Sequence, residues 1–301
     1  MYDLVVVGAG TAGLTAALYA LRAGKSVAVL EGNSFGGQIA YSPRVENFPT
    51  IKEIAGSEFA DKLFDQVVFQ GADVDMGEVL EVNKLPDGTF EAVTEYGKTN
   101  ARAVVLATGV KHRHLNTEAE ARLLGKGVFY CALCDGAFYK DHEMAVLGDG
   151  NTALQYALYL TGLSPKVHLI TLTDKLMGDG GLQQRIFAND KIVWHKSVNL
   201  IDMKGETALE GVVLTHGDGS EELLPVDALF VAIGQVPDNK RFSSLADLDS
   251  QGYFASGEDC KTKTEGVFVA GDCRAKAIRQ LTTAAGDGAV AGTNAVNWLN
   301  K

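Results

Sequence analysis

A glycine-rich pattern that occurs twice constrains the fold of this chain more than any other feature. Residues 4–31 read LVVVGAGTAGLTAALYALRAGKSVAVLE. An apolar run, a glycine turn, an Ala- and Leu-rich stretch and a second apolar run predict a strand, a tight turn, a helix and a strand. In such a unit the N-terminus of the helix faces a pyrophosphate. Glu31, which ends the second run, can accept hydrogen bonds from an adenosine ribose.

The second copy begins 140 residues after the first. Residues 144–171 read MAVLGDGNTALQYALYLTGLSPKVHLIT, so that Gly148 matches Gly8. The same spacing carries Glu31 onto Thr171, and the second copy therefore lacks the ribose-binding carboxylate. We predict an α/β fold with two Rossmann-like dinucleotide-binding domains.

Further strands that end in glycine turns follow each copy and suggest how the domains are arranged. ARAVVLATGVKHR follows the first copy and DALFVAIGQVPDN follows the second, and a late strand leads into a helix of small residues. We predict that the second domain is inserted into the first. Residues 1–113 and 241–301 would form the first domain, and residues 114–240 the inserted one. The chain would then cross twice between domains, which allows a hinge.

Composition and charge exclude several classes of function. The chain has 301 residues and a net charge of −11, with no basic cluster to bind nucleic acid. No apolar run approaches the roughly 20 residues that span a bilayer. The N-terminal MYDLVVVGAG has neither the basic region nor the cleavage site of a signal peptide. We therefore expect a cytoplasmic protein, in which a Cys-x-x-Cys pair indicates metal binding or redox chemistry.

Cys131 and Cys134, in the stretch YCALCDGAF, form such a pair. A structural zinc needs four ligands, but Cys260 and Cys273 lie far along the chain and the six histidines form no cluster in the sequence. We therefore predict a working dithiol and no metal site. Asp135 is the candidate acid–base group for it, and the alternative is a carboxylate that caps a turn.

Together these motifs resemble one family over essentially the whole chain, the low-molecular-weight thioredoxin reductases among the flavin disulfide reductases. The resemblance implies a homodimeric, FAD-dependent enzyme that reduces the disulfide of thioredoxin or a thioredoxin-like protein. The stretches that carry it are GAGTAG (8–13), GGQI (36–39), VENFP (45–49), ATG (107–109), GKGVFYCALCDG (125–136), GDGNTALQYALYL (148–160), GVFVAGD (266–272) and RQLTTAAGDG (279–288).

The resemblance assigns FAD to the first domain. An aspartate at the end of a strand can bind a ribityl hydroxyl, and backbone amides at the start of the last helix can stabilise negative charge on reduced flavin. The residues that it implies are Gly8, Gly10, Gly13, Glu31, Gly37, Gln38, Asn47, Gly109, Gly271, Asp272, Arg279 and Gln280.

For the dithiol, the resemblance implies a redox-active disulfide in which Cys134 faces the flavin and Cys131 attacks the disulfide of the partner protein. A thiolate is the nucleophile in each exchange, so a proton carrier is needed nearby. Asp135 has that role by resemblance as well as by position.

The sequence departs from the family in the second copy. Relatives that use NADPH carry His-Arg-Arg there for the 2′-phosphate, whereas this chain has Thr171, Leu172 and Thr173. Asp149 adds a carboxylate to the glycine turn, and Gln155-Tyr156 replaces an acidic pair. The second nucleotide site would comprise Gly148, Gly150, Asn151 and Thr152, and which nucleotide it binds, NADPH, NADH or another, stays open.

We predict that the reductase chemistry is kept while the electron donor is changed or relaxed from NADPH, with reduced ferredoxin ranked before NADH. One alternative is a flavin-based redox sensor or binding protein with a non-functional donor site. Another is a flavoprotein reductase of ferredoxin or flavodoxin, but those proteins lack the dithiol present here in CALCDG.

Overall fold

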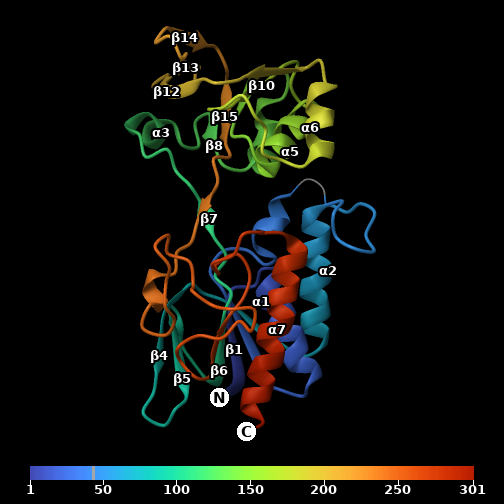
Figure 1. Ribbon diagram of the computed structural model, residues 1–301, viewed down its shortest axis with the longest axis vertical. Helices are drawn as coiled ribbons and strands as arrows, with labels where there is room; N and C mark the ends of the chain where they lie inside the picture. Colours follow the sequence, from blue (N-terminus) through green and yellow to red (C-terminus); the bar gives the residue numbers. More distant parts are fainter. Residues whose placement is uncertain (43–44) are drawn as a thin grey trace. The chain divides into compact units, whose positions relative to one another are not determined.

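Two units make up the chain in the computed structural model, which describes residues 1–42 and 45–301 (Figure 1). Unit 1 comprises Met1–Lys111 and Val236–Lys301, and unit 2 comprises His112–Gln235. The chain passes between them in two short strands that pair with each other, β7 (Lys111–His112) and β16 (Gln235–Val236). The boundaries predicted from the sequence lie a few residues further along the chain than this strand pair.

A seven-stranded sheet forms the centre of unit 1, in the order β3-β2-β1-β6-β5-β4, with β17 also paired to β6. Strands β1, β2, β3, β6 and β17 are parallel, and β4 and β5 form an antiparallel hairpin. The strands and helices are β1 (Tyr2–Val7), α1 (Thr11–Arg22), β2 (Val27–Glu31), α2 (Gly56–Phe69), β3 (Asp73–Met76), β4 (Val79–Lys84), β5 (Phe90–Thr94), β6 (Gly97–Leu106), β17 (Val267–Val269) and α7 (Leu281–Leu299).

The central strands of this sheet are buried on both faces, which explains why β1, β2, β17 and the second half of β6 are mostly apolar. The edge strand β3 (DVDM) is largely exposed. Successive side chains of a strand point to opposite faces. Leu4 and Val6 of β1 belong to the core formed with α1 and α7, whereas Val5 and Val7 pack in the opposite core with Phe254. Figure 1 shows α1, α2 and α7 along one side of the sheet.

Unit 2 repeats the strand–turn–helix–strand arrangement. Its five-stranded parallel sheet has the order β11-β10-β9-β15-β8, and a separate antiparallel sheet has the order β12-β13-β14. The elements are α3 (Glu118–Leu123), β8 (Val128–Phe129), α4 (Ala132–Asp135), β9 (Met144–Leu147), α5 (Asn151–Leu160), β10 (Val167–Ile170), α6 (Gly180–Phe187), β11 (Ile192–His195), β12 (Asn199–Lys204), β13 (Gly211–Thr215), β14 (Glu221–Leu224) and β15 (Ala228–Val231).

The second glycine-rich stretch builds β9, α5 and β10, as the first builds β1, α1 and β2. The prediction of an α/β fold with two Rossmann-like units is thus confirmed. Among the described residues, no helix is both long and apolar enough to cross a bilayer.

Candidate functional site

The first glycine turn lies between β1 and α1 and has no room for side chains. Gly8 adopts a φ of 103°, and a Cβ added to Gly13 would overlap the carbonyl oxygen of Gly8. Glu31, at the end of β2, accepts a hydrogen bond from the backbone N–H of Ala9 at 2.7 Å and one from that of Asn33 at 2.8 Å. The turn is therefore an open cradle at a helix N-terminus, which suits a pyrophosphate.

A second segment of unit 1 lies against this cradle. Gly36 forms a bridge with Gly10, and Gly37 has a φ of 63°. A Cβ on Gly37 would stand 3.1 Å from the Cα of Gly10, so only a glycine fits this close approach. Gln38 donates from Nε2 to the carbonyl oxygen of Val110 at 2.6 Å, which ties the segment to the loop between β6 and β7.

The loop after β17 presents the polar groups predicted to hold the flavin side of the cofactor. Asp272 has a buried Oδ1 atom without a partner among the described residues, and burial raises the pKa of this carboxyl. Arg279 donates from Nε to the carbonyl oxygen of Asp272 at 3.2 Å. Asn47 donates from Nδ2 to Oε1 of Gln280, the N-cap of α7, at 3.1 Å. A buried acceptor without a partner costs about 1–3 kcal/mol, so a cofactor hydroxyl would stabilise it.

The twelve residues predicted to contact FAD all lie in unit 1, and the polar atoms described above fit that cofactor. The two not yet described, Gly109 and Gly271, lie in turns and have φ angles of 63° and 83°. Sequence analysis missed Tyr253, whose ring lies 4.0 Å below the guanidinium of Arg279. No motif marks this tyrosine, because it reaches the arginine from a separate loop. The contacts of the twelve predicted residues with FAD stay proposals.

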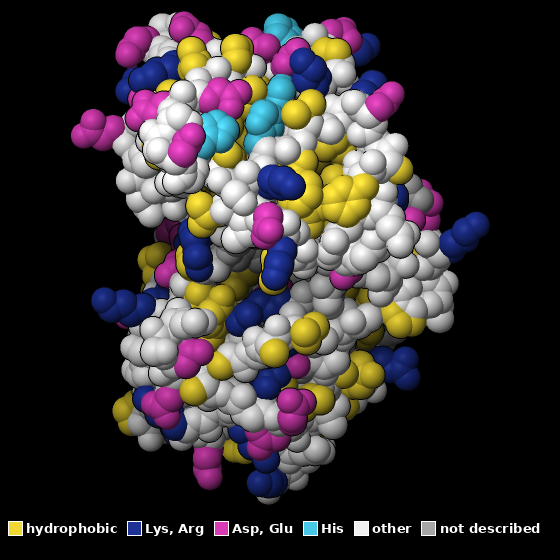
Figure 2. All heavy atoms as spheres, turned by 45° about the horizontal axis from the view of Figure 1, so that its top comes forward, with side chains coloured by type: hydrophobic (Ala, Val, Ile, Leu, Met, Phe, Trp, Pro, Cys, Tyr) yellow, Lys and Arg dark blue, Asp and Glu magenta, His cyan; other side chains and the backbone are white. Residues whose placement is uncertain are grey.

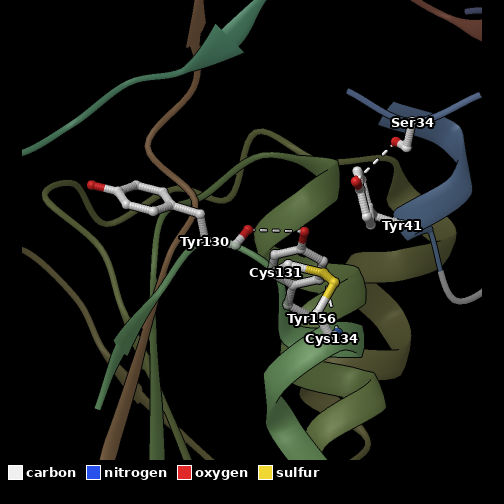
Figure 3. Close-up of a disulfide and its surroundings, with 6 residues drawn as sticks. All are labelled: Ser34, Tyr41, Tyr130, Cys131, Cys134 and Tyr156. Carbon is white, nitrogen blue, oxygen red and sulfur yellow. Dashed lines mark hydrogen bonds between the residues drawn. A yellow bond between two sulfur atoms is a disulfide. The ribbon is translucent and has the colours of Figure 1, made fainter. Parts of the chain in front are cut away.

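The dithiol lies in unit 2 at the start of α4. Cys131 and Cys134 are joined in a disulfide, and the backbone N–H of Cys134 lies 3.1 Å from Sγ of Cys131. The hydroxyl of Tyr156 donates to the carbonyl oxygen of Tyr130 at 3.2 Å (Figure 3). Cys134 is exposed and Cys131 is half-buried. The hydrogen bond from Tyr156 connects helix α5 to the peptide that precedes the cysteine pair.

Asp135 follows Cys134 directly, and its surroundings favour the protonated form. Burial raises the pKa of the Asp135 carboxyl. Burial and then the charge of Asp135 raise the pKa of Tyr156 to about 12, and the same two causes raise that of Tyr139. The phenols near Asp135 are therefore neutral at physiological pH. A carboxyl in this setting can act as a general acid.

A groove of about 450 Å³ lies within unit 2 and is lined by residues next to the two cysteines in the sequence, although neither cysteine lines it. Tyr130, Asp135, Phe138 and Tyr139 line it together with Phe129. The side chain of Phe138 is 80% exposed, which is unusual for a large apolar residue. This groove was not predicted from the sequence, although the aromatic pair Phe138-Tyr139, which follows CDGA, was a usable signal.

The second glycine turn has the same backbone form as the first, but Thr171 stands where the first copy has the ribose-binding Glu31. Gly148 has a φ of 141°, and α5 begins two residues after Asp149. Thr171, 1% exposed, donates its hydroxyl to the carbonyl oxygen of Thr173 at 2.7 Å and accepts from Nε1 of Trp194 at 2.9 Å. The Thr171 hydroxyl is therefore occupied within the protein and cannot replace the carboxylate of Glu31.

The segment that follows Thr171 has Leu172 and Thr173 where cations were to be expected for NADPH, and its cation, Lys175, comes two residues later. Leu172 and Met177 are 69% and 73% exposed, and the backbone N–H of Met177 donates to the carbonyl oxygen of Asp149 at 2.8 Å. Asp179 accepts from Nδ2 of Asn151 at 3.1 Å. Two carboxylates thus flank the predicted site of Gly148, Gly150, Asn151 and Thr152.

Two histidines that are far apart in the sequence, His168 and His195, meet in the structure. His168 lies 2.9 Å from His195 between ring nitrogens, and its other nitrogen lies 3.0 Å from Glu143. Parallel pairing of β10 with β11 places both histidines on one sheet face, because His195 pairs with Ile170, two residues after His168. Figure 2 shows histidine side chains among acidic ones. Within residues 1–42 and 45–301, no three His, Cys, Asp or Glu side chains are arranged to hold a metal.

Comparison with known proteins gave consistent matches over the whole length. The pyridine nucleotide-disulphide oxidoreductase family matches residues 2–288. A thioredoxin reductase of Listeria innocua is 40% identical over 304 residues, which cover 100% of this chain and 95% of that protein. The crystal structure of Lactococcus lactis thioredoxin reductase in the FR conformation has a TM-score of 0.96 and 32% identity, and 100% and 99% of the chains are covered. A ferredoxin-flavin thioredoxin reductase from Clostridium acetobutylicum has a TM-score of 0.54 and 26% identity, with 99% and 98% covered.

Proposed function

The chain belongs to the low-molecular-weight thioredoxin reductases of the pyridine nucleotide-disulphide oxidoreductase family, and we propose that it reduces thioredoxin through Cys131 and Cys134. Like its family, it is an FAD-dependent oxidoreductase. The observation that carries the proposal is the bonded cysteine pair beside Asp135. A cytoplasmic location and a homodimer stay predictions.

When bound, FAD supplies the electron pair that reduces the Cys131–Cys134 disulfide. In our proposal the backbone amides of the first glycine turn bind its pyrophosphate, and Glu31 accepts hydrogen bonds from its ribose. Asp272 accepts a hydrogen bond from a ribityl hydroxyl through the oxygen that has no partner in the described part of the chain. The N-terminus of α7, at Gln280, stabilises negative charge on the reduced ring.

The dithiol then exchanges with the partner disulfide in two steps. The Cys131 thiolate attacks one partner sulfur, so that a mixed disulfide forms and the other partner sulfur leaves as a thiolate, which Asp135 protonates. The Cys134 thiolate next attacks Sγ of Cys131. This restores the Cys131–Cys134 disulfide and expels the second partner sulfur as a thiolate, which takes a proton from water. The partner is released as a dithiol, with two electrons transferred in total.

The groove in unit 2 that Phe138 and Tyr139 line supports a protein partner. An exposed aromatic side chain, Phe138, next to a reactive pair is typical of a docking surface rather than of a small-molecule site. The apolar surface around a partner's exposed disulfide would pack on Phe138 and Tyr139 and bring that disulfide to Cys131. We therefore propose that this groove receives thioredoxin.

We further propose that the electron donor is not NADPH. The residues that would meet its 2′-phosphate are Thr171, Leu172 and Thr173, and the Thr171 hydroxyl is already bonded within the protein. The carboxylates of Asp149 and Asp179 add negative charge beside the same turn. Reduced ferredoxin ranks before NADH, because NADH still requires the second glycine turn.

The proposal is tested with anaerobic protein that has been reduced by dithionite and freed of excess reductant. Oxidised thioredoxin is added, and released thiols are counted. We expect two thiols per thioredoxin disulfide from the wild type and none from Cys131→Ser. Cys260→Ala, which removes a buried cysteine in unit 1, is the matched control and should behave as the wild type. Reduced wild type that releases no thiols would favour the redox-sensor alternative.

A further inference from the structure

Three buried charged residues, Asp287, Arg274 and Lys276, lie together close to the backbone that carries Asp272. The proposed chemistry does not use them. The carboxylate of Asp287, in α7, contacts Nη1 of Arg274 at 2.6 Å with one oxygen and Nζ of Lys276 at 2.7 Å with the other. Their side chains are only 13%, 4% and 12% exposed, in the order Asp287, Arg274, Lys276. Charges buried this deeply are retained only when they are paired.

This group lies where two FAD-binding segments meet. The Asp287 oxygen that binds Lys276 also accepts from the backbone N–H of Gly271 at 3.0 Å, one residue before Asp272. A Cβ on Gly271 would stand 2.7 Å from the Cβ of Ala12, in the first turn of α1. Asp287 therefore fixes the backbone that carries Asp272 and does so next to the glycine turn.

The two cations depend on Asp287 to different degrees. Arg274 also donates to the carbonyl oxygen of Gly257 at 2.6 Å. Lys276 has, besides Asp287, a single longer contact among the described residues, with the carbonyl oxygen of Thr283 at 3.5 Å. The ammonium group of Lys276 is thus held by one carboxylate.

Asp272 stands four residues before Lys276 in the same loop. Burial raises the pKa of Asp272, and the charge of Lys276 acts in the opposite direction, so the two groups interact. A buried ammonium that loses its carboxylate needs another partner. Without Asp287, Lys276 would pair with Asp272 and occupy the oxygen that has no partner among the described residues.

We infer that Asp287 is a positioning residue for FAD, which keeps Lys276 away from Asp272 so that the Asp272 carboxylate stays available to the ribityl chain. The inference concerns FAD binding alone and does not depend on the electron donor or on the protein partner. It differs from a purely structural role because removal of Lys276 should repair the loss of Asp287.

The test measures the dissociation constant of FAD by flavin fluorescence after apoprotein is prepared from the full chain. We expect Asp287→Asn to weaken FAD binding about tenfold and Lys276→Met to change it less than about threefold. The double variant should return to within about threefold of Lys276→Met. Unchanged binding by Asp287→Asn, or a double variant as weak as Asp287→Asn, would overturn the inference.

Two further variants guard against misfolding and general charge effects. Asp247→Asn breaks an exposed pair in the same unit, with Lys263 at 2.9 Å, and should leave FAD binding unchanged. If Asp287→Asn does not fold because Arg274 loses its partner, Arg274→Met combined with Asp287→Asn removes that buried cation as well. Lys276 still faces Asp272 in this background, so the same weakening and the same repair by Lys276→Met are expected, and their absence refutes the role.

Discussion

Among single residues, Asp135 has the setting that most affects the proposed chemistry. Burial raises the pKa of its carboxyl, and the neighbouring phenols of Tyr139 and Tyr156 offer no positive charge to lower it. Asp135 therefore keeps its proton to a higher pH than an exposed aspartate does. As a general acid it works below this raised pKa, and proton donation is lost as the pH rises through it.

Asp135→Asn should slow the reduction of thioredoxin by roughly 10²- to 10⁴-fold, because the amide keeps the shape but donates no ionisable proton. The measurement is the rate of thiol release from pre-reduced protein as the pH is raised from about 4, the ordinary pKa of an aspartate. Wild type should lose rate as the pH rises through the raised pKa of Asp135, and the variant should lack this falling limb. Asp141→Asn, on the surface nearby, is the control, and a rate for Asp135→Asn within about twofold of wild type would reduce Asp135 to a capping role.

The two cysteines should be distinguishable by spectroscopy. Cys131→Ser leaves a thiolate at Cys134, which in our assignment faces the oxidised flavin, so a long-wavelength charge-transfer absorbance should appear. Cys134→Ser should lack this band and still bind FAD, since no proposed FAD contact involves either sulfur. Both variants should fail to reduce thioredoxin. A band in Cys134→Ser instead would mean that the two sulfurs are assigned the wrong way round.

How well residues could be predicted depends on whether their partners are near in sequence. The dithiol and the glycine turns are local patterns, and they were found. His168 and His195 are 27 residues apart and meet only because β10 pairs with β11 in one register. The ion pairs of Asp287 were missed although it stands in RQLTTAAGDG, because the sequence does not show which way a helical carboxylate points.

At the level of elements, α7 and α1 illustrate how small residues set the distance between helices. A Cβ on Gly288 of α7 would overlap the carbonyl oxygen of Ala12 and lie 2.8 Å from Cβ of Thr15. Gly286, two residues earlier, is exposed, and a Cβ there would meet nothing within 4 Å. The two positions differ in packing but not in the kind of element, so they form a matched pair.

Gly288→Ala should lower the free energy of unfolding by about 1–3 kcal/mol, since the added methyl group overpacks the contact with α1. Gly286→Ala should raise it by about 0.5–1 kcal/mol, because alanine loses less conformational entropy than glycine in a helix. Urea unfolding of the FAD-loaded proteins measures both. Equal effects of the two substitutions would contradict the close packing of α7 on α1.

The elements themselves were predictable where burial makes the pattern strong. The central parallel strands β1, β9, β15 and β17 are almost entirely apolar, and glycine turns follow β1 and β9. By contrast, β4 buries only Val79 and Val82 among six residues, and the antiparallel sheet of β12, β13 and β14 has no glycine motif. Such partly exposed strands carry a weak signal, and their pairing is decided by tertiary contacts.

For the molecule as a whole, the duplicated unit raises the question of where electrons enter. Both units carry a glycine turn, but in unit 1 Glu31 bonds to that turn, whereas in unit 2 Thr171 bonds to Thr173 and Trp194 instead. The same architecture therefore presents one turn with a ribose acceptor and one without. This difference bears on the donor and not on the dithiol, whose disulfide and neighbouring carboxyl are both present.

We accordingly expect NADPH to be a poor donor. A charge-assisted hydrogen bond to phosphate contributes about 1.5–3 kcal/mol. Two missing cations should therefore weaken NADPH affinity by at least about tenfold, compared with a family member that has them. NADH, without the 2′-phosphate, should lose less binding affinity, and reduced ferredoxin does not need the second glycine turn.

Anaerobic bleaching of the flavin, followed by stopped flow, should be fastest with ferredoxin and slowest with NADPH. A triple variant with Thr171→His, Leu172→Arg and Thr173→Arg restores the family's cations. It should accelerate flavin reduction by NADPH but not by NADH or ferredoxin. Fast, saturable reduction of the wild type by micromolar NADPH would show that Leu172 and Thr173 do not control donor choice.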